Sequence, residues 1–165
     1  MINQLLPGLT LVAALGTGLI AGVFYAFSTF VMKALARQPA PEGMAAMQSV
    51  NVVVINPMFL GVFLGTAAAC VTTIVAALLR WDRPGSAYLL AGAALYLVGT
   101  FGVTMAANVP LNNTLAAVSR EDPDAPRRWA DYVGRWTTWN HVRTAAALAA
   151  AGSFTVAFRL GGADQ

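Results

Sequence analysis

The residues best suited to chemistry lie in the stretch from Trp129 to Ala147. Read as one helix at about 100° per residue, this stretch aligns a narrow stripe of six side chains: Trp129, Tyr132, Trp136, Asn140, Arg143 and Ala147. An aromatic surface thus leads to an amide and a guanidinium, where the apolar run 145–158 begins. A guanidinium at the start of a hydrophobic helix costs free energy unless it has a partner or a ligand. Asn140 and Arg143 are therefore candidate site residues.

Two further amides interrupt an amphipathic stretch. Residues 42–55 have helical periodicity, and Gln48 and Asn51 lie on their otherwise apolar side. This pattern predicts either a helix that lies in the membrane interface or a lid whose amides face a pocket. Both alternatives remain open at the level of the sequence.

The other amides lie next to the ends of hydrophobic runs. Asn56 precedes Pro57, a pair typical of a helix start, so capping fully explains Asn56 without a ligand role. Asn108 and Asn112 follow the third hydrophobic run, together with Asn113. Amides can cap the free carbonyls at a helix end, which accounts for one or two of these three. Asn56, Asn108 and Asn112 are kept as candidate binding residues.

The single cysteine and the single histidine limit the available chemistry. Cys70 has no second cysteine with which to form an intrachain disulfide. One histidine, with the acidic residues outside the hydrophobic runs, does not supply the ligands of a zinc, di-iron or bis-histidine haem site, so we predict no metal. His141 is a candidate catalytic base. On the helical wheel it lies about 140° from Trp136, and the alternative is an interfacial histidine.

The composition indicates a membrane protein. Of 165 residues, 58% are hydrophobic and 10% are charged, whereas a soluble domain has roughly a quarter of charged residues. The apolar residues also occur in long runs, as membrane spans require. The net charge of +3 comes without a basic cluster, so the expected partner is the lipid bilayer and not a nucleic acid.

Four runs are long enough to cross a bilayer: residues 5–32, 57–79, 86–107 and 140–158. With short connections they predict an all-α fold, an integral membrane four-helix bundle of up-down-up-down topology, in one domain over residues 1–165. An extra amphipathic helix precedes the second span, and a helical extension precedes the fourth. No basic residue precedes the first run, which is longer than the core of a signal peptide, so we expect it to be retained.

Glycine and proline residues predict where the helices pack and end. Gly18 and Gly22 have the spacing that lets a neighbouring helix approach closely. Such a face also permits a homo-oligomer. Pro110 is expected to end the third helix.

An up-down-up-down topology brings most of the polar candidates to one end of the bundle. The end of the first span, the start of the second, the end of the third and the start of the fourth all lie there. We predict a pocket at this end, lined with the amides and Arg143 and walled by Trp136, Trp139 and Tyr25.

The basic residues flank the spans unevenly. Seven lie on the pocket side and three on the other: Lys33, Arg37, Arg120, Arg127, Arg128, Arg135 and Arg143 against Arg80, Arg83 and Arg159. Positive charge accumulates on the cytoplasmic side of membrane proteins. We therefore expect the protein in the cell (inner) membrane, with the pocket facing the cytoplasm and both termini outside.

Short motifs are spread over most of the chain: Ala21-Gly22, Ala26-Phe27-Ser28, Val31-Met32, Met47-Gln48 with Asn51, Asn56-Pro57, Val109-Pro110-Leu111-Asn112, and Trp136, Asn140 and Arg143-Thr144. Together they resemble the motifs of the anthrone oxygenase-like membrane proteins. They occur in the order of the family. Lys33 stands where the family often has proline.

This resemblance implies oxidation of anthrone-like aromatic polyketides to quinones by dioxygen, without metal, flavin or any other cofactor. In such an enzyme Arg143 and Asn140 would hold an oxyanion. Trp136 and Trp139 would sandwich the flat ring of a hydrophobic aromatic substrate, and Asn112 or Asn51 would position the substrate or dioxygen. A proton acceptor is also needed, either His141 or water.

A different class of function fits the same residues. In this alternative the protein is a non-enzymatic membrane module that binds a lipophilic ligand or a partner protein. The amides and Arg143 would then satisfy one another. A pocket of a few hundred Å³ beside Trp136 would favour the enzyme.

Overall fold

The structure is a computed structural model that describes residues 2–119 and 121–162. Within these residues all regular secondary structure is helical, and no strand occurs. Four helices are long and apolar enough to cross a membrane: Leu5–Ala36, Pro57–Leu78, Ser86–Ala116 and Ala125–Gly161. The predicted class, an all-α membrane protein with four spans, is therefore confirmed. Arg120, which was counted among the flanking charges, lies outside the described residues.

Two of the four long helices contain π-helical segments, which have a wider hydrogen-bond spacing than the α-helix. The first helix consists of α1 (Ile2–Ala26), η1 (Phe27–Val31) and α2 (Met32–Ala36). The second is α4 (Pro57–Leu78), and the shorter α3 (Ala40–Val53) precedes it. The third consists of α5 (Ser86–Ala94), η2 (Leu95–Gly102), η3 (Thr104–Asn108) and α6 (Val109–Ala116). The fourth is the continuous α7 (Ala125–Gly162), so the predicted extension before the fourth span is helical.

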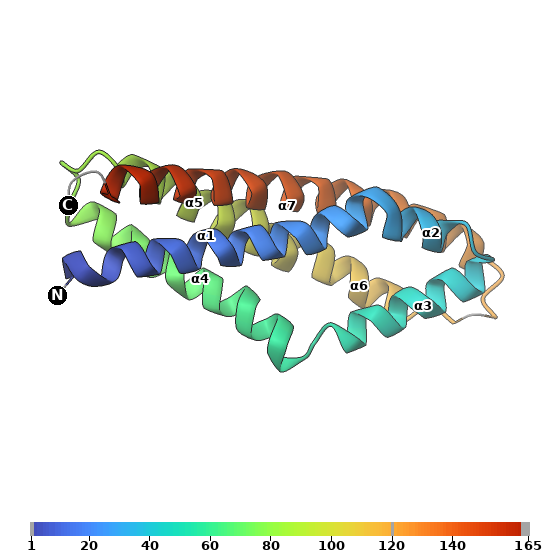
Figure 1. The fold of residues 1–165 in the computed structure, drawn as a ribbon. Helices are drawn as coiled ribbons and strands as arrows, with labels where there is room; N and C mark the ends of the chain where they lie inside the picture. The colour runs from blue at the N-terminus through green and yellow to red at the C-terminus, as the bar shows by residue number, and fades with distance from the viewer. Residues whose placement is uncertain (1, 120, 163–165) are drawn as a thin grey trace.

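The four long helices pack in a ring and alternate in direction (Figure 1). Helix α1 packs against α4 and α7, and α5 packs against the same two helices. The start of α1 and the end of α7 lie at one end of the molecule, which we call the terminal end. Helices α2, α3 and α6 and the start of α7 lie at the other, which we call the α3 end.

The predicted amphipathic helix is α3, which runs back along the molecule from α2 (Figure 1). Its Met44 and Met47 are buried, and α3 packs against α2, α6 and α7. The approach is closest at Gly43, where a Cβ atom would lie 2.6 Å from the carbonyl oxygen of Leu35. Helix α3 thus packs over the α3 end of the molecule, and the two alternatives for it, an interfacial helix and a lid, remain predictions.

The third helix continues beyond Pro110, so the prediction that it ends there was wrong. Pro110 lies in the first turn of α6, directly after the π-helical segment η3. A proline is tolerated in a first helical turn, because the N–H group that it lacks would have no acceptor within the helix. The change of helix type at Asn108 therefore lets the chain pass the proline without a loop.

Gly18 and Gly22 do not mediate packing within the chain, and that prediction was also wrong. A Cβ atom at either position would find no atom of another element within 4 Å. The close approach of α1 to α4 occurs instead at Gly16, where a Cβ would collide with Thr66. Because two residues turn a helix by about 200°, Gly16 and Gly18 face opposite sides of α1.

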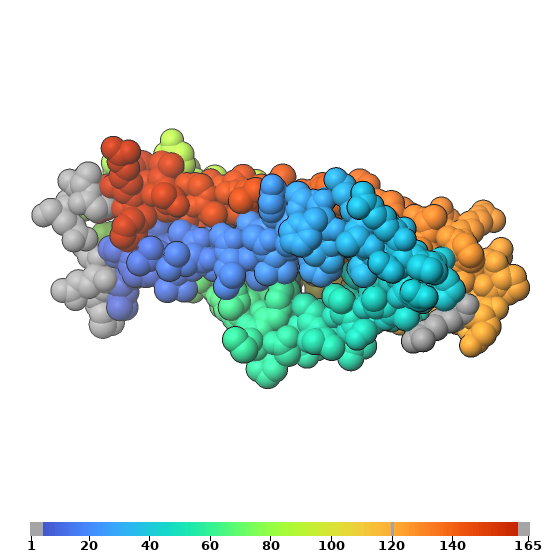
Figure 2. Space-filling model, turned by 45° about the vertical axis from the view of Figure 1, so that its right-hand side comes forward, coloured from blue at the N-terminus to red at the C-terminus, as the bar shows by residue number. Residues whose placement is uncertain are grey.

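The buried apolar side chains form two clusters. The larger lies among α1, α4, α5, η2 and α7 and includes Phe63, Tyr96 and Phe154. The second lies at the α3 end and includes Met47 and Trp129. Figure 2 shows the side chains of α2 and α3 packed together over this end. The polar candidates on α7 lie along the helix between residues of the two clusters.

Candidate functional site: a buried amide–arginine cluster

The stripe predicted on α7 faces the interior of the protein along its whole length. All six of its members are buried: Trp129, Tyr132, Trp136, Asn140, Arg143 and Ala147. The prediction of one continuous helix with this stripe on its packed side is therefore confirmed.

Arg143 is a buried cation, only 4% exposed. Its Nη2 donates to Oδ1 of Asn140 at 2.7 Å, and its Nη1 donates to Oγ1 of Thr104 at 3.2 Å. The guanidinium carbon lies 4.1 Å from the ring centroid of Phe24 and 5.1 Å from that of Trp136. Among the described residues no carboxylate forms an ion pair with it. The rings and two neutral acceptors therefore replace the counter-ion that a buried arginine normally has.

Asn140 holds this guanidinium in place and joins two helices. Its side chain is fully buried, and Nδ2 donates to the carbonyl oxygen of Phe24 and to Oγ of Ser28, both at 2.7 Å. The Ser28 hydroxyl is in turn 3.1 Å from that of Thr144, which donates to the Asn140 carbonyl. With its oxygen bonded to Arg143, the Asn140 amide uses both its donors and its acceptor.

Asn108 and Asn112 connect the third helix to α7. The Oδ1 atom of Asn112 accepts hydrogen bonds from the Tyr132 hydroxyl and from Nε1 of Trp136, both at 2.9 Å. Nδ2 of Asn108 donates to the carbonyl oxygen of Trp136 at 3.2 Å. Asn51 of α3 lies near the Tyr132 hydroxyl. Three elements, α3, η3 and α6, thus bring amides to one stretch of α7.

Three buried polar atoms of this group have no hydrogen-bond partner within the described chain. They are Nδ2 of Asn51, Oδ1 of Asn108 and Nε of Arg143. Buried donors and acceptors without a partner are rare, and each costs free energy. We call Asn51, Asn108, Asn112, Asn140 and Arg143 the amide–arginine cluster. The cluster has two donors and one acceptor to offer to a ligand or to water.

Three other candidates lie on the surface of the helices. Tyr25 is 55% exposed and Trp139 is 42% exposed. His141 is also exposed. The structure does not bring these side chains into the amide–arginine cluster, because each follows or precedes a buried residue and a single residue turns the helix by about 100°.

Gln48 and Asn56 form hydrogen bonds to the backbone at helix ends. Nε2 of Gln48 donates to the carbonyl oxygens of Leu115 and Val118, just where α6 ends. Oδ1 of Asn56 accepts from the backbone N–H of Phe59 and caps α4. The capping alternative therefore describes Asn56, and Gln48 likewise satisfies carbonyls of a helix end.

The sequence analysis missed four residues that complete the cluster. Phe24 stacks on the guanidinium, and Thr104 accepts a hydrogen bond from it. Ser28 and Thr144 support Asn140. The hydroxyl residues have a sequence signal in that Ser28 and Thr144 belong to the motifs that resemble the family. Phe24 has none, since an apolar residue in a membrane helix is ordinary.

The described structure has a cavity at each end of the molecule. One, of about 180 Å³, lies between α6 and α7 at the α3 end, with Leu111 and Leu115 on one side and Tyr132 and Arg135 on the other. Tyr132 thus contacts this cavity and, through its hydroxyl, the amide–arginine cluster. The second, of about 150 Å³, lies at the terminal end and is discussed below.

Residues that commonly hold metal ions are dispersed. Among the described residues, no three histidine, cysteine, aspartate or glutamate side chains lie close enough together to hold an ion. Cys70 is buried in α4 as a free thiol. The polar chemistry of the interior is therefore that of amides, hydroxyls and one guanidinium.

Asn112→Ala is expected to lower the free energy of unfolding by about 2–3 kcal/mol, because it leaves the Tyr132 hydroxyl and the Trp136 N–H without an acceptor. Chemical unfolding of the detergent-solubilised protein measures this change. Asn113→Ala is the matched control, since Asn113 is exposed and its loss should change stability by less than about 0.5 kcal/mol. Equal effects of the two substitutions would contradict the assigned hydrogen bonds.

A family model described as anthrone oxygenase matches residues 57–153. The match covers more than half of the chain and includes four members of the amide–arginine cluster: Asn108, Asn112, Asn140 and Arg143. No curated protein and no solved structure matches the chain. By its sequence, the chain belongs to the anthrone oxygenase family.

Proposed function

We propose that this membrane protein oxidises a hydrophobic anthrone-like or other phenolic substrate with dioxygen, using the amide–arginine cluster and neither metal nor flavin. The observation that carries the proposal is the buried guanidinium of Arg143, which has an N–H without a partner and no carboxylate counter-ion among the described residues. Such a group is suited to stabilise an anion that forms during a reaction. Membership of the anthrone oxygenase family supports this chemistry.

The reaction needs little from the protein beyond stabilisation of charge. An anthrone is a carbon acid, and loss of a methylene proton places negative charge on its oxygen. The electron-rich carbon then adds dioxygen to form a peroxide, which loses water to give the new carbonyl group. One substrate and one dioxygen thus yield one quinone and one water. The methylene carbon loses four electrons, and dioxygen gains them.

Four members of the cluster have a role in this scheme. Arg143, oriented by Asn140, holds the oxyanion, and the low dielectric of the interior strengthens that interaction. The free donor of Asn51 and the free acceptor of Asn108 position the substrate or dioxygen. The ring of Trp136 provides an apolar wall. Since His141 is exposed on α7, the scheme assigns the proton to water.

The cavity between α6 and α7 provides an approach to the cluster. Tyr132 lines it and also donates to Asn112. Rotation of the Tyr132 side chain would connect the cavity with the cluster. Arg135 at the cavity favours substrates that are acidic phenols.

A second function is favoured by a different observation. The Asn140 amide is fully hydrogen-bonded, and Arg143 already has two acceptors and two aromatic rings. Most donors and acceptors of the cluster are thus hydrogen-bonded within the protein, as they would be in a non-enzymatic module that binds a lipophilic ligand or a partner. This alternative predicts binding without turnover.

The placement in the cell is part of the proposal. The four apolar helices support a membrane protein. The excess of basic residues at the α3 end supports the inner membrane with the cluster towards the cytoplasm. Labelling of single cysteines introduced at Arg37 and Trp81, in the Cys70→Ala background, tests this orientation in intact cells.

Oxygen uptake by the purified, detergent-solubilised protein tests the proposed reaction. The panel contains anthrones and hydroquinones, and ¹⁸O₂ reports whether one labelled oxygen enters the quinone. We expect uptake above the spontaneous rate in the wild type. Arg143→Ala and Asn140→Ala should both abolish it, whereas Arg159→Ala, which removes an exposed arginine from the same helix, should not.

Two outcomes would contradict parts of the proposal. Uptake at the spontaneous rate across the whole panel argues against anthrone chemistry, and a ligand-binding screen then tests the alternative. Uptake that persists in folded Arg143→Ala shows that the guanidinium is not part of the reaction.

A further inference from the structure

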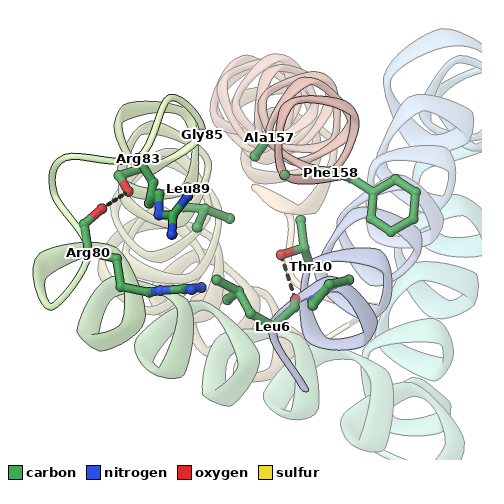
Figure 3. Close-up of a pocket in the computed structure, with 11 residues that line it drawn as sticks. Leu6, Thr10, Arg80, Arg83, Gly85, Leu89, Ala157 and Phe158 are labelled. Carbon is green, nitrogen blue, oxygen red and sulfur yellow. Dashed lines mark hydrogen bonds between the residues drawn. The ribbon is translucent and has the colours of Figure 1, made fainter. Parts of the chain in front are cut away.

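The cavity at the terminal end combines cationic and apolar groups (Figure 3). Its volume is about 150 Å³, and α1, α5, α7 and the turn between α4 and α5 all contribute to it. Arg80 and Arg83 line it together with apolar residues of the helices, among them Leu6, Leu89 and Phe158. Figure 3 shows both guanidinium groups directed towards the space between the turn and α1.

The two guanidinium groups dominate the polar lining. The hydroxyls in the cavity wall bond to the chain itself: Thr10 donates to the carbonyl oxygen of Leu6, and Ser86 donates to that of Arg80. An anion with several oxygens is the natural partner of two adjacent guanidinium groups. Neutral polar ligands would gain less, because few unused hydrogen-bonding groups remain for them.

The cavity lies where the hydrophobic helices begin and end. Helices α4 and α7 end next to it, and α1 and α5 begin there. Trp81 in the turn and Tyr88 in the first turn of α5 are exposed, and aromatic residues of this kind mark the interface between lipid and water. A ligand at this level of the protein meets lipid headgroups on one side and apolar helix surface on the other.

We propose that the cavity binds the phosphate group of an anionic ligand, with Arg80 and Arg83 as the two cationic contacts. The phosphate can come from an acidic phospholipid headgroup or from free phosphate. The apolar walls formed by Leu6 and Phe158 would accept the first carbons of a lipid. Each arginine also has an interaction within the chain, and the proposal requires the phosphate to compete with it.

This site is separate from the amide–arginine cluster. It lies at the opposite end of the molecule, and none of its lining residues belongs to the cluster. The inference therefore does not depend on the proposed reaction.

Native mass spectrometry of the full chain, released from detergent with added lipid, tests the proposal. The probes are phosphatidylglycerol and, for comparison, zwitterionic phosphatidylcholine. We expect phosphatidylglycerol to bind in preference, and Arg80→Gln/Arg83→Gln to weaken its binding by about tenfold or more. The matched control is Arg37→Gln/Arg127→Gln, which removes two exposed arginines from the α3 end and should retain binding.

Inorganic phosphate distinguishes the two sources. Its effect on the melting temperature is compared with that of chloride at equal ionic strength. Stabilisation by phosphate that is lost in Arg80→Gln/Arg83→Gln supports a site for free phosphate, whereas stabilisation by the lipid alone supports the headgroup. Should the double variant fold poorly, Arg80→Lys/Arg83→Lys keeps both charges and should retain preferential binding. Equal binding by the wild type and a folded Gln variant, or equal losses in the variant and the control, would overturn the proposal.

Discussion

Arg143→Met is expected to lower the substrate-dependent oxygen uptake by about 10²–10³-fold, the usual cost of losing one stabiliser of an oxyanion. The same substitution should lower the free energy of unfolding by no more than about 1–2 kcal/mol, because removal of a buried charge that has no carboxylate partner offsets the loss of the hydrogen bond to the Asn140 oxygen. Its unbranched side chain can also keep the contacts with the rings of Phe24 and Trp136. Activity and stability should therefore respond separately at this position.

Uptake measurements and chemical unfolding of the same preparation check both halves of this expectation. Arg143→Lys is the matched comparison, because it keeps the charge without the planar group and should retain part of the activity. A large loss of stability in Arg143→Met would assign the guanidinium a structural role. That result would favour the non-enzymatic alternative.

Asn140→Leu is expected to be the most destabilising substitution in the cluster, at about 2–4 kcal/mol. It removes the bonds to the Phe24 carbonyl and to Ser28, and it deprives Arg143 of its 2.7 Å acceptor. Each interhelical hydrogen bond in a membrane protein contributes about 0.6–2 kcal/mol, and the partners that remain are buried. The contact between α1 and α7 should loosen as a result.

The free energy of unfolding in denaturant provides this measurement, and hydrogen exchange along α1 locates the effect. Thr138→Leu is the matched control, since Thr138 is exposed on α7 and bonds only within its own helix. We expect little change from this control. Unaltered exchange around Phe24 in Asn140→Leu would show that the amide does not join the two helices.

The sequence was sufficient to predict the buried side of α7. The hydrophobic period of a helix specifies its packed side without knowledge of the neighbours, so Trp136, Asn140 and Arg143 could be placed together. The four spans could also be predicted from the sequence, because the length and the apolar composition of a segment do not depend on its neighbours.

The partner of a residue depends on the rotation of the neighbouring helix, which local patterns do not contain. For this reason the sequence analysis favoured Tyr25, a polar aromatic residue, where the structure has Phe24 over the guanidinium. The π-helical segment η1 follows directly and changes the rotation of the chain beyond Ala26. No residue pattern in the first span predicts this switch from α-helix to π-helix.

The hydrogen-bond partners of the amide side chains were equally hard to predict from the sequence. Gln48, Asn56 and Asn112 have the same chemical group, yet only Asn112 bonds to the side chains of α7. Asn56 could be assigned locally, because an N-cap is recognised from its own neighbours. The partners of Gln48 are the carbonyls of Leu115 and Val118, far along the chain, and only the packing of α3 on α6 reveals them.

The length of α7 has a consequence for how ligands arrive. Arg143 precedes Arg159 by sixteen residues, a rise of about 24 Å along the helix, which is less than the roughly 30 Å thickness of a hydrocarbon layer. With Arg159 at one boundary of the layer, the guanidinium lies within the acyl chains of the opposite leaflet. Under the proposed function, a hydrophobic substrate would therefore reach the guanidinium from within that leaflet. Its occupancy would follow its partition coefficient and the volume of lipid present, so apparent affinities should vary with the ratio of lipid to protein.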